Sequence, residues 1–517
     1  MWYSPDVDAC DYLPDALSIF VVGASGDLAK KKTYPSLYDL YRSDFLTKRT
    51  TICGYARSSK TDDEFKDQIR PFLKGGTEQQ KTSFLKLCHY RQGAYDSADD
   101  VAKAFELLEE KERDSQNGRA NRLFYFAIPP SVFVPIGKSI KEAIVSKAEK
   151  NRVGWQRLIV EKPFGKDSES FEELSSAMKA LYTEDYIYRI DHYLGKEMVQ
   201  NLVILRFSNA IFEPIWNRNF IRSVVITFKE DFGTKGRGGY FDGYGIIRDV
   251  LQNHLLQVLS LIAMEPPVEV TGDGSATYVR DEKVKVLRAI DPVRLEDCVL
   301  GQYKGASDGS EPAYTGDPTV PDDSVTPTYA AMILRIQNPR WEGVPFILKA
   351  GKALNERKAE IRIQFKAAPG AERMFAGHEI PEQELVMRLQ PDEAVYMKTN
   401  VKSPGLTTKP TTSELDLTYK HRFDNNKMEA ADAYTRLILE VIRGRQATFV
   451  RDDELKASWD IFTPLLHQIE QERVKPILYE YGSRGPPEAD ELIHRAGYRY
   501  HGGTYEWSKE DNNKESD

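Results

Sequence analysis

Apolar runs alternate with amphipathic stretches from the N-terminus to about residue 180. The apolar runs with the length of buried strands lie at 17–22, 51–55, 123–128 and 157–161. The segments 99–113 and 133–147 carry apolar residues at helical spacing. Strands that alternate with helices are typical of parallel βαβ units. The pattern therefore predicts an α/β domain at 1–190, built on a Rossmann-like, doubly wound parallel sheet.

Beyond residue 190 the pattern changes to strands in which polar and apolar residues alternate. These strands are predicted at 223–229, 329–336, 360–365 and 384–390. Because no helix is expected between each pair, we predict a large, mainly antiparallel sheet in an α+β domain at 191–507. The loop at 305–326 is rich in Gly, Pro, Ser and Asp, and we expect it to be exposed. The charged tail at 508–517 is expected to be disordered.

The composition favours a soluble globular protein with two large domains. The chain has 517 residues, of which 41% are hydrophobic and 29% charged, and single cores rarely grow to that length. No run approaches the roughly 18 apolar residues of a membrane span. The ends show neither a signal peptide nor a sorting signal, so we expect a cytoplasmic protein. The net charge of -8 argues against nucleic acid as a main partner.

The cysteines give no sign of a metal site or of a disulfide framework. The chain contains four of them, Cys10, Cys53, Cys88 and Cys298. They are widely spaced and form no CxxC pair. We interpret them as reduced structural thiols, with a redox switch between two of them as the alternative.

A glycine-rich loop follows the first predicted strand directly. The segment GASGDLAK at 23–30 is a GxxGxxA variant of the dinucleotide-binding fingerprint. Glycine lets the backbone approach a pyrophosphate, and the next helix offers free N–H groups at its start. The predicted cofactor-binding residues here are Gly23, Ser25, Gly26, Asp27 and Leu28. The alternative is an ordinary corner between a strand and a helix.

The end of the second predicted strand carries Arg57 where dinucleotide sites that prefer NAD carry an acidic residue. An acidic side chain would repel a 2′-phosphate, whereas an arginine can form charge-assisted hydrogen bonds with it. Arg57 therefore favours NADP over NAD. A solvated surface arginine is the alternative interpretation.

Two further segments carry polar side chains that a simple fold does not require. Lys162 follows the strand at 157–161, and the carboxyl ends of parallel strands are where doubly wound proteins bind ligands. The Lys162-Pro163 bond is a candidate for the cis form. If 189–197 is helical, His192 and Lys196 share one face, and two nitrogen donors one turn apart suit a phosphate monoester. A strand-ending turn and a solvated helix face are the alternatives.

The apolar helix predicted from residue 248 to residue 264 places His254 on its inward face. A buried histidine is commonly a core residue, but a general base also needs a shielded imidazole held by a carboxylate. Asp191 is the candidate for that carboxylate. Asp249 lies five positions before His254, so in an α-helix the two side chains do not share a face.

Several segments together resemble the glucose 6-phosphate dehydrogenase family. They are GASGDLAKKK, EKPFG, RIDHYLGKE, GRGGYFDGYGIIRDVLQNH, GKALNERKAEIRIQF and YGSRGPPEADEL. The resemblance extends from about residue 18 to residue 507, and RIDHYLGKE is the most specific of these motifs. It implies NADP-dependent oxidation of glucose 6-phosphate at C1 to 6-phosphogluconolactone, the first step of the oxidative pentose phosphate pathway. It also implies that the reaction needs no metal and that the chain forms a homodimer or a dimer of dimers.

The resemblance implies a role for each matching residue. His254 takes the proton of the C1 hydroxyl, Asp191 orients it, and Lys162 contacts both sugar and cofactor. The implied contacts to the 6-phosphate are His192, Tyr193 and Lys196. The implied contacts to the rest of the sugar are Glu230, Asp249, Lys352 and Arg357. Tyr95 is counted with the cofactor-binding residues.

Some members of the family hold a second, structural NADP in the large domain. The residues that match this site are Lys358, Arg362, Arg388, Tyr396, Lys398, Asp416, Arg484, Tyr505 and Trp507. An aromatic ring beside an arginine cluster suits a nicotinamide and phosphates. The alternative is a buried network of ion pairs that closes a dimer face.

Two other functions remain as alternatives. A catalytically silent NADP-binding or scaffold protein can share the fold, because fold alone does not prove chemistry. Such a protein would be expected to lack Asp191, His254 or Lys162, and all three are present. The second alternative is a different NADP-dependent sugar dehydrogenase.

Overall fold

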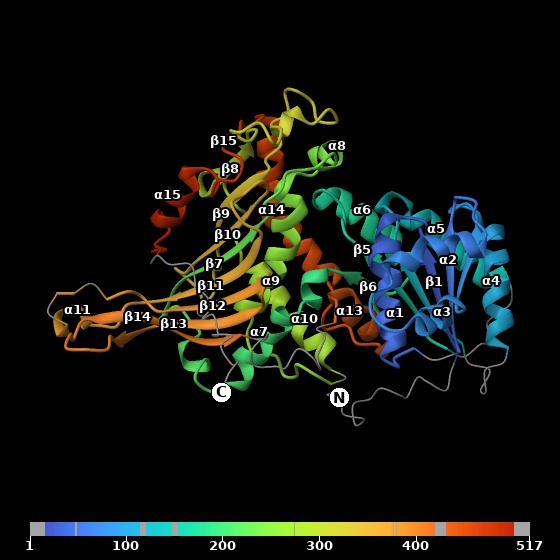
Figure 1. Ribbon diagram of the computed structural model, residues 1–517, viewed down its shortest axis with the longest axis horizontal. Helices are drawn as coiled ribbons and strands as arrows, with labels where there is room; N and C mark the ends of the chain where they lie inside the picture. Colours follow the sequence, from blue (N-terminus) through green and yellow to red (C-terminus); the bar gives the residue numbers. More distant parts are fainter. Residues whose placement is uncertain are drawn as a thin grey trace, which may run out of the picture.

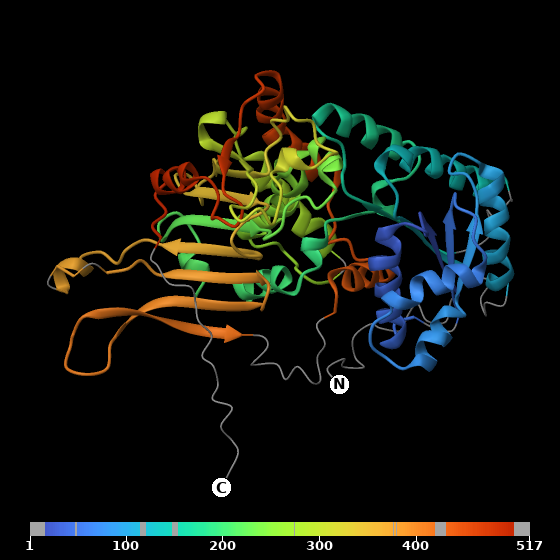
Figure 2. The ribbon, with the colours of Figure 1, turned by 45° about the horizontal axis from the view of Figure 1, so that its top comes forward.

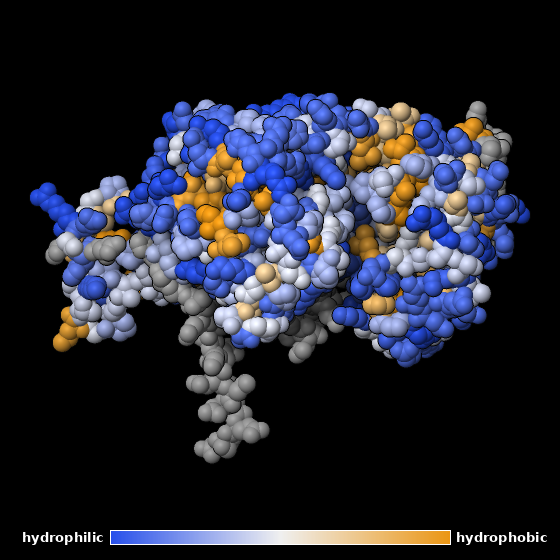
Figure 3. All heavy atoms as spheres, turned by 90° about the horizontal axis from the view of Figure 1, so that it is seen from above, coloured by the Kyte–Doolittle hydropathy of each residue, from blue (hydrophilic) through white to orange (hydrophobic). Residues whose placement is uncertain are grey.

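The computed structural model describes residues 16–46, 49–113, 120–146, 154–272, 274–375, 377–378, 380–418 and 431–500. These residues form two sheet-based parts that lie side by side (Figures 1 and 2). The surface seen from above is mainly hydrophilic, with apolar patches over both parts (Figure 3). Among the described helices, none is long and apolar enough to cross a membrane.

The first part is a six-stranded parallel sheet in the order β3-β2-β1-β4-β5-β6. Its strands are β1 (Ala16–Val22), β2 (Thr50–Ala56), β3 (Cys88–Gln92), β4 (Ala120–Phe126), β5 (Gln156–Glu161) and β6 (Ile187–Ile190). Its α-helices are α1 (Tyr34–Arg42), α2 (Asp62–Ile69), α3 (Glu78–Leu85), α4 (Ala98–Glu112), α5 (Phe133–Ser146) and α6 (Ser168–Lys179). Short helical turns lie at η1 (Ala29–Thr33), η2 (Arg70–Phe72), η3 (Pro130–Val132) and η5 (Glu184–Tyr186).

Both faces of this sheet are buried, as a doubly wound fold requires. Successive residues of β1 contribute to two different core clusters, Phe20 to the one with α4 and α5, and Ile19 to the one with α1. Side chains alternate between the faces of a strand, so β1 is covered on both sides. The strand order reverses at β1, where β1 and β4 are neighbours, and ligands bind at such a point. The predicted doubly wound parallel sheet is therefore confirmed.

The second part is a nine-stranded sheet in the order β14-β13-β12-β11-β7-β10-β9-β8-β15. Its strands are β7 (Ile221–Lys229), β8 (Cys298–Tyr303), β9 (Tyr329–Arg335), β10 (Pro345–Gly351), β11 (Lys358–Phe365), β12 (Glu384–Gln390), β13 (Ala394–Lys402), β14 (Pro410–Thr418) and β15 (Ile477–Tyr479). The β7–β10 and β8–β15 pairs are parallel, and the other described pairs are antiparallel. The predicted large, mainly antiparallel sheet is confirmed.

Helices of the second part pack against this sheet and against the first part. The α-helices are α7 (Glu197–Ser208), α8 (Gly238–Asp242), α9 (Leu256–Ala263), α10 (Ser275–Arg288), α11 (Ala371–Met374), α13 (Ala433–Arg443), α14 (Asp452–Gln471) and α15 (Pro487–Arg495). Shorter or irregular helical elements are η6 (His192–Gly195), η7 (Glu213–Ile215), η8 (Ile247–Leu255), η9 (Leu295–Asp297) and η10 (Tyr314–Gly316). Residues of α13 share a core cluster with β1 and α1, so this late segment belongs to the packing of the first sheet (Figure 1).

Two sequence predictions were wrong in part. Besides the helix expected at 248–264, helices α8 and α10 lie between the strand at 223–229 and the strand at 329–336. The loop at 305–326 is not exposed throughout, because Tyr314 is fully buried and donates a hydrogen bond to Asp242 over 2.8 Å. The domain limits of 1–190 and 191–507 stay a prediction, and the tail at 508–517 lies outside the described residues.

Candidate active site

The glycine loop joins β1 to the first helix at the carboxyl edge of the sheet. Gly23 has φ +81°, and a Cβ there would lie 2.4 Å from the carbonyl oxygen of Ala127. Only glycine fits this close approach. The N–H of Gly26 donates to the carbonyl of Gly23 over 2.9 Å, which closes the turn. Ser25 accepts a hydrogen bond from Ser58, at the end of the next strand, over 2.9 Å.

Asp27 and Leu28 begin the helix that follows this loop. The Asp27 carboxylate is exposed and pairs with Lys30 and Lys31 over 2.6 and 2.9 Å. Leu28 packs against the core cluster of the sheet. Their backbone N–H groups therefore stand at the start of a helix, the position that can bind a pyrophosphate.

Arg57 and Tyr95 lie beside this loop and contact each other. The guanidinium carbon of Arg57 is 5.4 Å from the centre of the Tyr95 ring, a cation–π distance. Arg57 is exposed, and within the described part of the chain it forms no ion pair. Its charge is therefore available to an anion at the end of β2.

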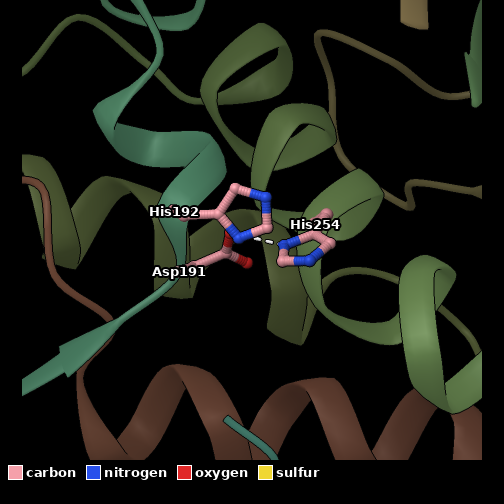
Figure 4. A group of neighbouring side chains, drawn as sticks. All are labelled: Asp191, His192 and His254. Atoms are coloured by element: carbon pink, nitrogen blue, oxygen red, sulfur yellow. Dashed lines mark hydrogen bonds and ion pairs between the residues drawn. The ribbon is translucent and has the colours of Figure 1, made fainter. Parts of the chain in front are cut away.

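Asp191 and His254 form a buried polar pair at the junction of the two parts (Figure 4). Nδ1 of His254 lies 2.5 Å from Oδ1 of Asp191, and both residues are 4% exposed. The same carboxylate oxygen accepts the N–H of Tyr193 over 2.9 Å. Because Nδ1 is engaged, Nε2 is the ring nitrogen that a substrate can reach.

The carboxyl of Asp191 is ionised in this pair. Burial alone would raise the pKa of Asp191, but the neighbouring His254 and its hydrogen bond lower that pKa to about 2. Asp191 therefore remains ionised over the whole neutral range. A fixed anion beside an imidazole selects the tautomer with a proton on Nδ1 and stabilises the ring when it gains a second proton.

The helix that carries His254 is a π-helix, η8, and this changes one sequence interpretation. In a π-helix each hydrogen bond spans five residues, so residues five apart lie close to each other on successive turns. Asp249 and His254 therefore point to the same side, contrary to the expectation for an α-helix. His254 is also one of the groups that lower the pKa of Asp249.

Lys162 reaches this cluster from the end of β5. Its Nζ donates to the backbone oxygen of Asp249 over 2.8 Å and to Oδ1 of the same residue over 3.0 Å. Lys352 pairs with Glu230, and its Nζ lies 4.0 Å from Oδ2 of Asp249. Burial would raise the pKa of Asp249, but these two lysines lower it to about 2. The Lys162-Pro163 bond is cis.

His192, Tyr193 and Lys196 lie at the opposite end of the same cluster. The expectation that His192 and Lys196 share one helical face was wrong, because η6 is a 3-10 turn that ends at Gly195 and Lys196 is extended. Gly195 fits closely here, since a Cβ would meet the carbonyl of Ala433 at 2.6 Å. The Lys196 Nζ instead lies 5.0 Å from the centre of the Tyr193 ring.

Arg357 and Gln390 complete this end of the site. Arg357 is exposed and is close enough to influence the pKa of both Tyr193 and Lys196. Gln390 accepts a hydrogen bond from Lys196 over 2.7 Å. The sequence analysis missed Gln390, which lies at the end of β12 and carries no local signal beyond the proline that follows it.

A second cavity, of about 790 Å³, lies away from this cluster against the large sheet. Five predicted residues line it, namely Lys358, Arg362, Arg388, Tyr396 and Arg484. Lys398 is buried on the neighbouring β13, and Asp416 pairs with Tyr396 in the β13–β14 register. Tyr505 and Trp507 lie outside the described residues. Ion pairs are present here too, since Arg362 bonds Glu360 and Glu384 over 2.6 and 2.7 Å; that such pairs close a dimer face stays an alternative interpretation.

Among the residues of this cavity that the sequence analysis missed, three lie on the central strands of the large sheet. Thr227 and Lys229 alternate along β7, and Lys349 lies on the adjacent β10. Burial lowers the pKa of Lys349 to about 8. A period-two pattern of polar residues on a central strand is a signal that could have identified Thr227 and Lys229.

Two remaining predictions concern metals and thiols. Asp191, His192 and His254 have ligand atoms within 4.8 Å of one another, and the expectation of a metal-free reaction stays a prediction.

Cys53, Cys88 and Cys298 are free, and burial raises the pKa of Cys53 and of Cys298 to about 12. A protonated, buried thiol is a poor nucleophile, which agrees with a structural role for these three. Cys10 lies outside the described residues.

A glycine loop on a doubly wound sheet, next to a buried histidine–carboxylate pair, defines a dinucleotide-dependent oxidoreductase. Residues 20–201 match the family described as "Glucose-6-phosphate dehydrogenase, NAD binding domain", and residues 203–501 match the one described as "Glucose-6-phosphate dehydrogenase, C-terminal domain".

Individual proteins with known names give the same result. The chain is 53% identical over 502 residues to glucose-6-phosphate 1-dehydrogenase of Dictyostelium discoideum, covering 95% of this chain and 98% of the relative. It is 54% identical over 495 residues to the cytoplasmic isoform of Solanum tuberosum, covering 94% and 93%. A solved glucose-6-phosphate dehydrogenase in complex with its substrate glucose-6-phosphate superposes with a TM-score of 0.88, at 46% identity, over 94% of this chain and 99% of that one. The chain belongs to the glucose-6-phosphate dehydrogenase family, a family of oxidoreductases.

Proposed function

We propose that the chain oxidises glucose 6-phosphate at C1 with NADP, forming 6-phosphogluconolactone and NADPH. The observation that carries this proposal is the hydrogen bond between His254 and Asp191, buried beside the ion pairs of Lys162 and Lys352. The name of the relatives and the substrate bound in the solved neighbour support it.

His254 is the general base of the proposed reaction. Its Nε2 accepts the proton of the C1 hydroxyl while the C1 hydrogen leaves as a hydride and a C1=O double bond forms. Asp191 holds the ring through Nδ1 and stabilises the imidazolium that results. When bound, NADP supplies the acceptor for the hydride. No metal ion takes part in the proposed step.

The polar groups around His254 form two sets, one suited to the ring hydroxyls of the sugar and the other to its phosphate. A charged row of donors and acceptors suits the ring hydroxyls, and it consists of Lys162, Glu230, Asp249 and Lys352. His192, Tyr193, Lys196 and Arg357 offer donors to the 6-phosphate at the other end. The buried Tyr193 hydroxyl has no partner among the described residues, as a ligand-binding donor requires.

The glycine loop fits a dinucleotide, because Gly23 could not carry a side chain without meeting Ala127. The residues proposed to hold the catalytic NADP are Gly23, Ser25, Gly26, Asp27, Leu28, Arg57, Tyr95 and Lys162. The exposed Arg57, which forms no ion pair with any residue the structure describes, supports a preference for the 2′-phosphate of NADP.

We further propose that the second cavity binds a structural NADP. Its lining of lysines and arginines suits phosphates, and Tyr396 offers a ring to the nicotinamide or adenine. A homodimer or a dimer of dimers, with 191–507 as the substrate and dimerisation domain, also belongs to this proposal. So does a cytoplasmic location, in agreement with the name of the Solanum tuberosum relative.

A direct assay tests the proposed activity. NADPH formation is followed by the ultraviolet absorbance of the reduced nicotinamide, with glucose 6-phosphate, glucose and glucose 1-phosphate as separate substrates. We expect rapid turnover of glucose 6-phosphate alone. Equal rates with glucose would show that the phosphate end of the site has no function.

A further inference from the structure

His192, at the phosphate end of the proposed site, is held by rings and not by hydrogen bonds. Within the described part of the chain its imidazole forms no hydrogen bond. Three rings surround it: His254 with centres 4.5 Å apart, Tyr193 at 5.2 Å and Tyr434 at 5.9 Å. The first two meet it edge to face, whereas Tyr434 lies parallel to it, with an interplanar angle of 10°. Packing against these rings therefore sets the direction of the His192 nitrogens.

Tyr434 lies far away in the sequence, in the first turn of α13, and it is 8% exposed. The turn that carries His192 fits against this same end of α13. Arg436 donates to the carbonyl of Gly195 over 2.8 Å and pairs with Glu197. The helix and the turn are thus joined next to the stacked rings.

Tyr434 is itself fixed to the cofactor-binding sheet. Burial and the nearby carboxyl of Glu161 raise the pKa of Tyr434, and Tyr125 donates a hydrogen bond to that same carboxyl over 2.6 Å. Its backbone N–H donates to Asp432 over 2.9 Å, and Asp432 pairs with Lys32 of η1 over 2.9 Å. The position of the ring is therefore set by β4, β5 and η1. Glu161 precedes Lys162, which belongs to the charged row of the site.

We infer that Tyr434 is a positioning residue, whose ring holds His192 in the orientation that binds the phosphate of the substrate. The inference rests on the proposed function. It assigns a task in substrate selection to α13, a helix that carries none of the residues proposed to touch substrate or cofactor. The aromatic ring of Tyr434 is the part that positions His192.

The test compares Tyr434→Leu, which removes the ring, with Tyr434→Phe, which keeps it. Phe449→Leu is the matched control, because Phe449 is fully buried in the same core cluster and meets Tyr188 edge to face at 5.0 Å, away from His192. The measurements are KM for glucose 6-phosphate, kcat/KM for glucose, KM for NADP, and the affinity for inorganic phosphate by calorimetry.

For Tyr434→Leu we expect KM for glucose 6-phosphate and the Kd of inorganic phosphate to rise roughly three- to tenfold, the range of one lost aromatic contact. The kcat/KM for glucose and the KM for NADP should stay within about twofold of the wild-type values. Tyr434→Phe and Phe449→Leu should both resemble the wild type. A loss that is equal for glucose and for its phosphate, or one that Phe449→Leu reproduces, would assign Tyr434 a merely structural role. If the wild type forms no NADPH from glucose 6-phosphate, the proposed function fails, and the calorimetric affinity for phosphate still decides the inference.

Discussion

The imidazole of His254 is joined to the carboxylate of Asp191 by a hydrogen bond of 2.5 Å that spans 63 positions of the sequence. Asp191 directly follows β6, an edge strand of the parallel sheet, and His254 lies on the π-helix of the second part. The reacting centre therefore exists only where the two parts meet. Cofactor and sugar must be brought together at this junction for the hydride to transfer.

Arg57 tests the preference for NADP. We expect Arg57→Ala to weaken the binding of NADP by roughly 10- to 150-fold, because a charge-assisted hydrogen bond contributes about 1.5–3 kcal/mol. NAD, which lacks the 2′-phosphate, should lose little. KM measured for both cofactors checks this, and equal losses for the two would show that Arg57 does not read the phosphate.

Lys196 tests the phosphate end of the sugar site. We propose that its ammonium contacts the phosphate both before and during the reaction, so we expect Lys196→Ala to remove binding that the ground state and the transition state share. KM for glucose 6-phosphate should rise by about tenfold or more, with a smaller fall in kcat. Unphosphorylated glucose is the control substrate. A change in kcat alone would contradict the placement of Lys196 at the phosphate.

The pKa of Glu161 leads to a prediction of how the free energy of unfolding depends on pH. Burial raises its pKa to about 7, although Tyr125 and Lys162 oppose this shift. Between its ordinary pKa and 7, the folded chain keeps a proton that the unfolded chain has released. This stabilisation is complete below the ordinary pKa and is lost as pH rises through 7, by an amount on the order of 3 kcal/mol.

Glu161→Gln cannot lose this proton. From pH 5 to pH 8, its free energy of unfolding should therefore fall less than that of the wild type. Urea midpoints for both proteins at several pH values measure the difference. Parallel pH profiles would mean that Glu161 titrates normally in the folded chain.

The second cavity predicts that NADP stabilises the fold without the catalytic site. A Gly23→Val variant should abolish the first site, because any Cβ there meets Ala127. Added NADP should still raise its Tm, since a ligand that binds only the native state stabilises it. Combining Gly23→Val with Arg362→Ala should remove the effect. An unchanged Tm of Gly23→Val with NADP would show that the cavity does not hold the cofactor.

The sequence predicted those features that depend on neighbouring residues. The first strand, the glycine loop that begins at Gly23 and the start of the next helix follow one another along the chain. A local pattern was therefore sufficient to predict them. The π-helix was not predictable, because an α-helix is the ordinary outcome for the apolar run around His254. The strands β3 and β6 were missed because β3 carries polar residues and β6 has only four residues. Lys349 and Gln390 reach their sites through strand pairing across the large sheet, which no short segment encodes.

The kcat of His254→Asn at saturating glucose 6-phosphate tests the central claim most directly. Asparagine keeps much of the hydrogen bonding of histidine but cannot take the proton, and general base catalysis contributes about 10²- to 10⁴-fold. We therefore predict a fall in kcat of at least that range, or roughly 3–5 kcal/mol of barrier, with little change in the Kd of the sugar phosphate. A kcat near that of the wild type would contradict the account and leave His254 as a buried core histidine.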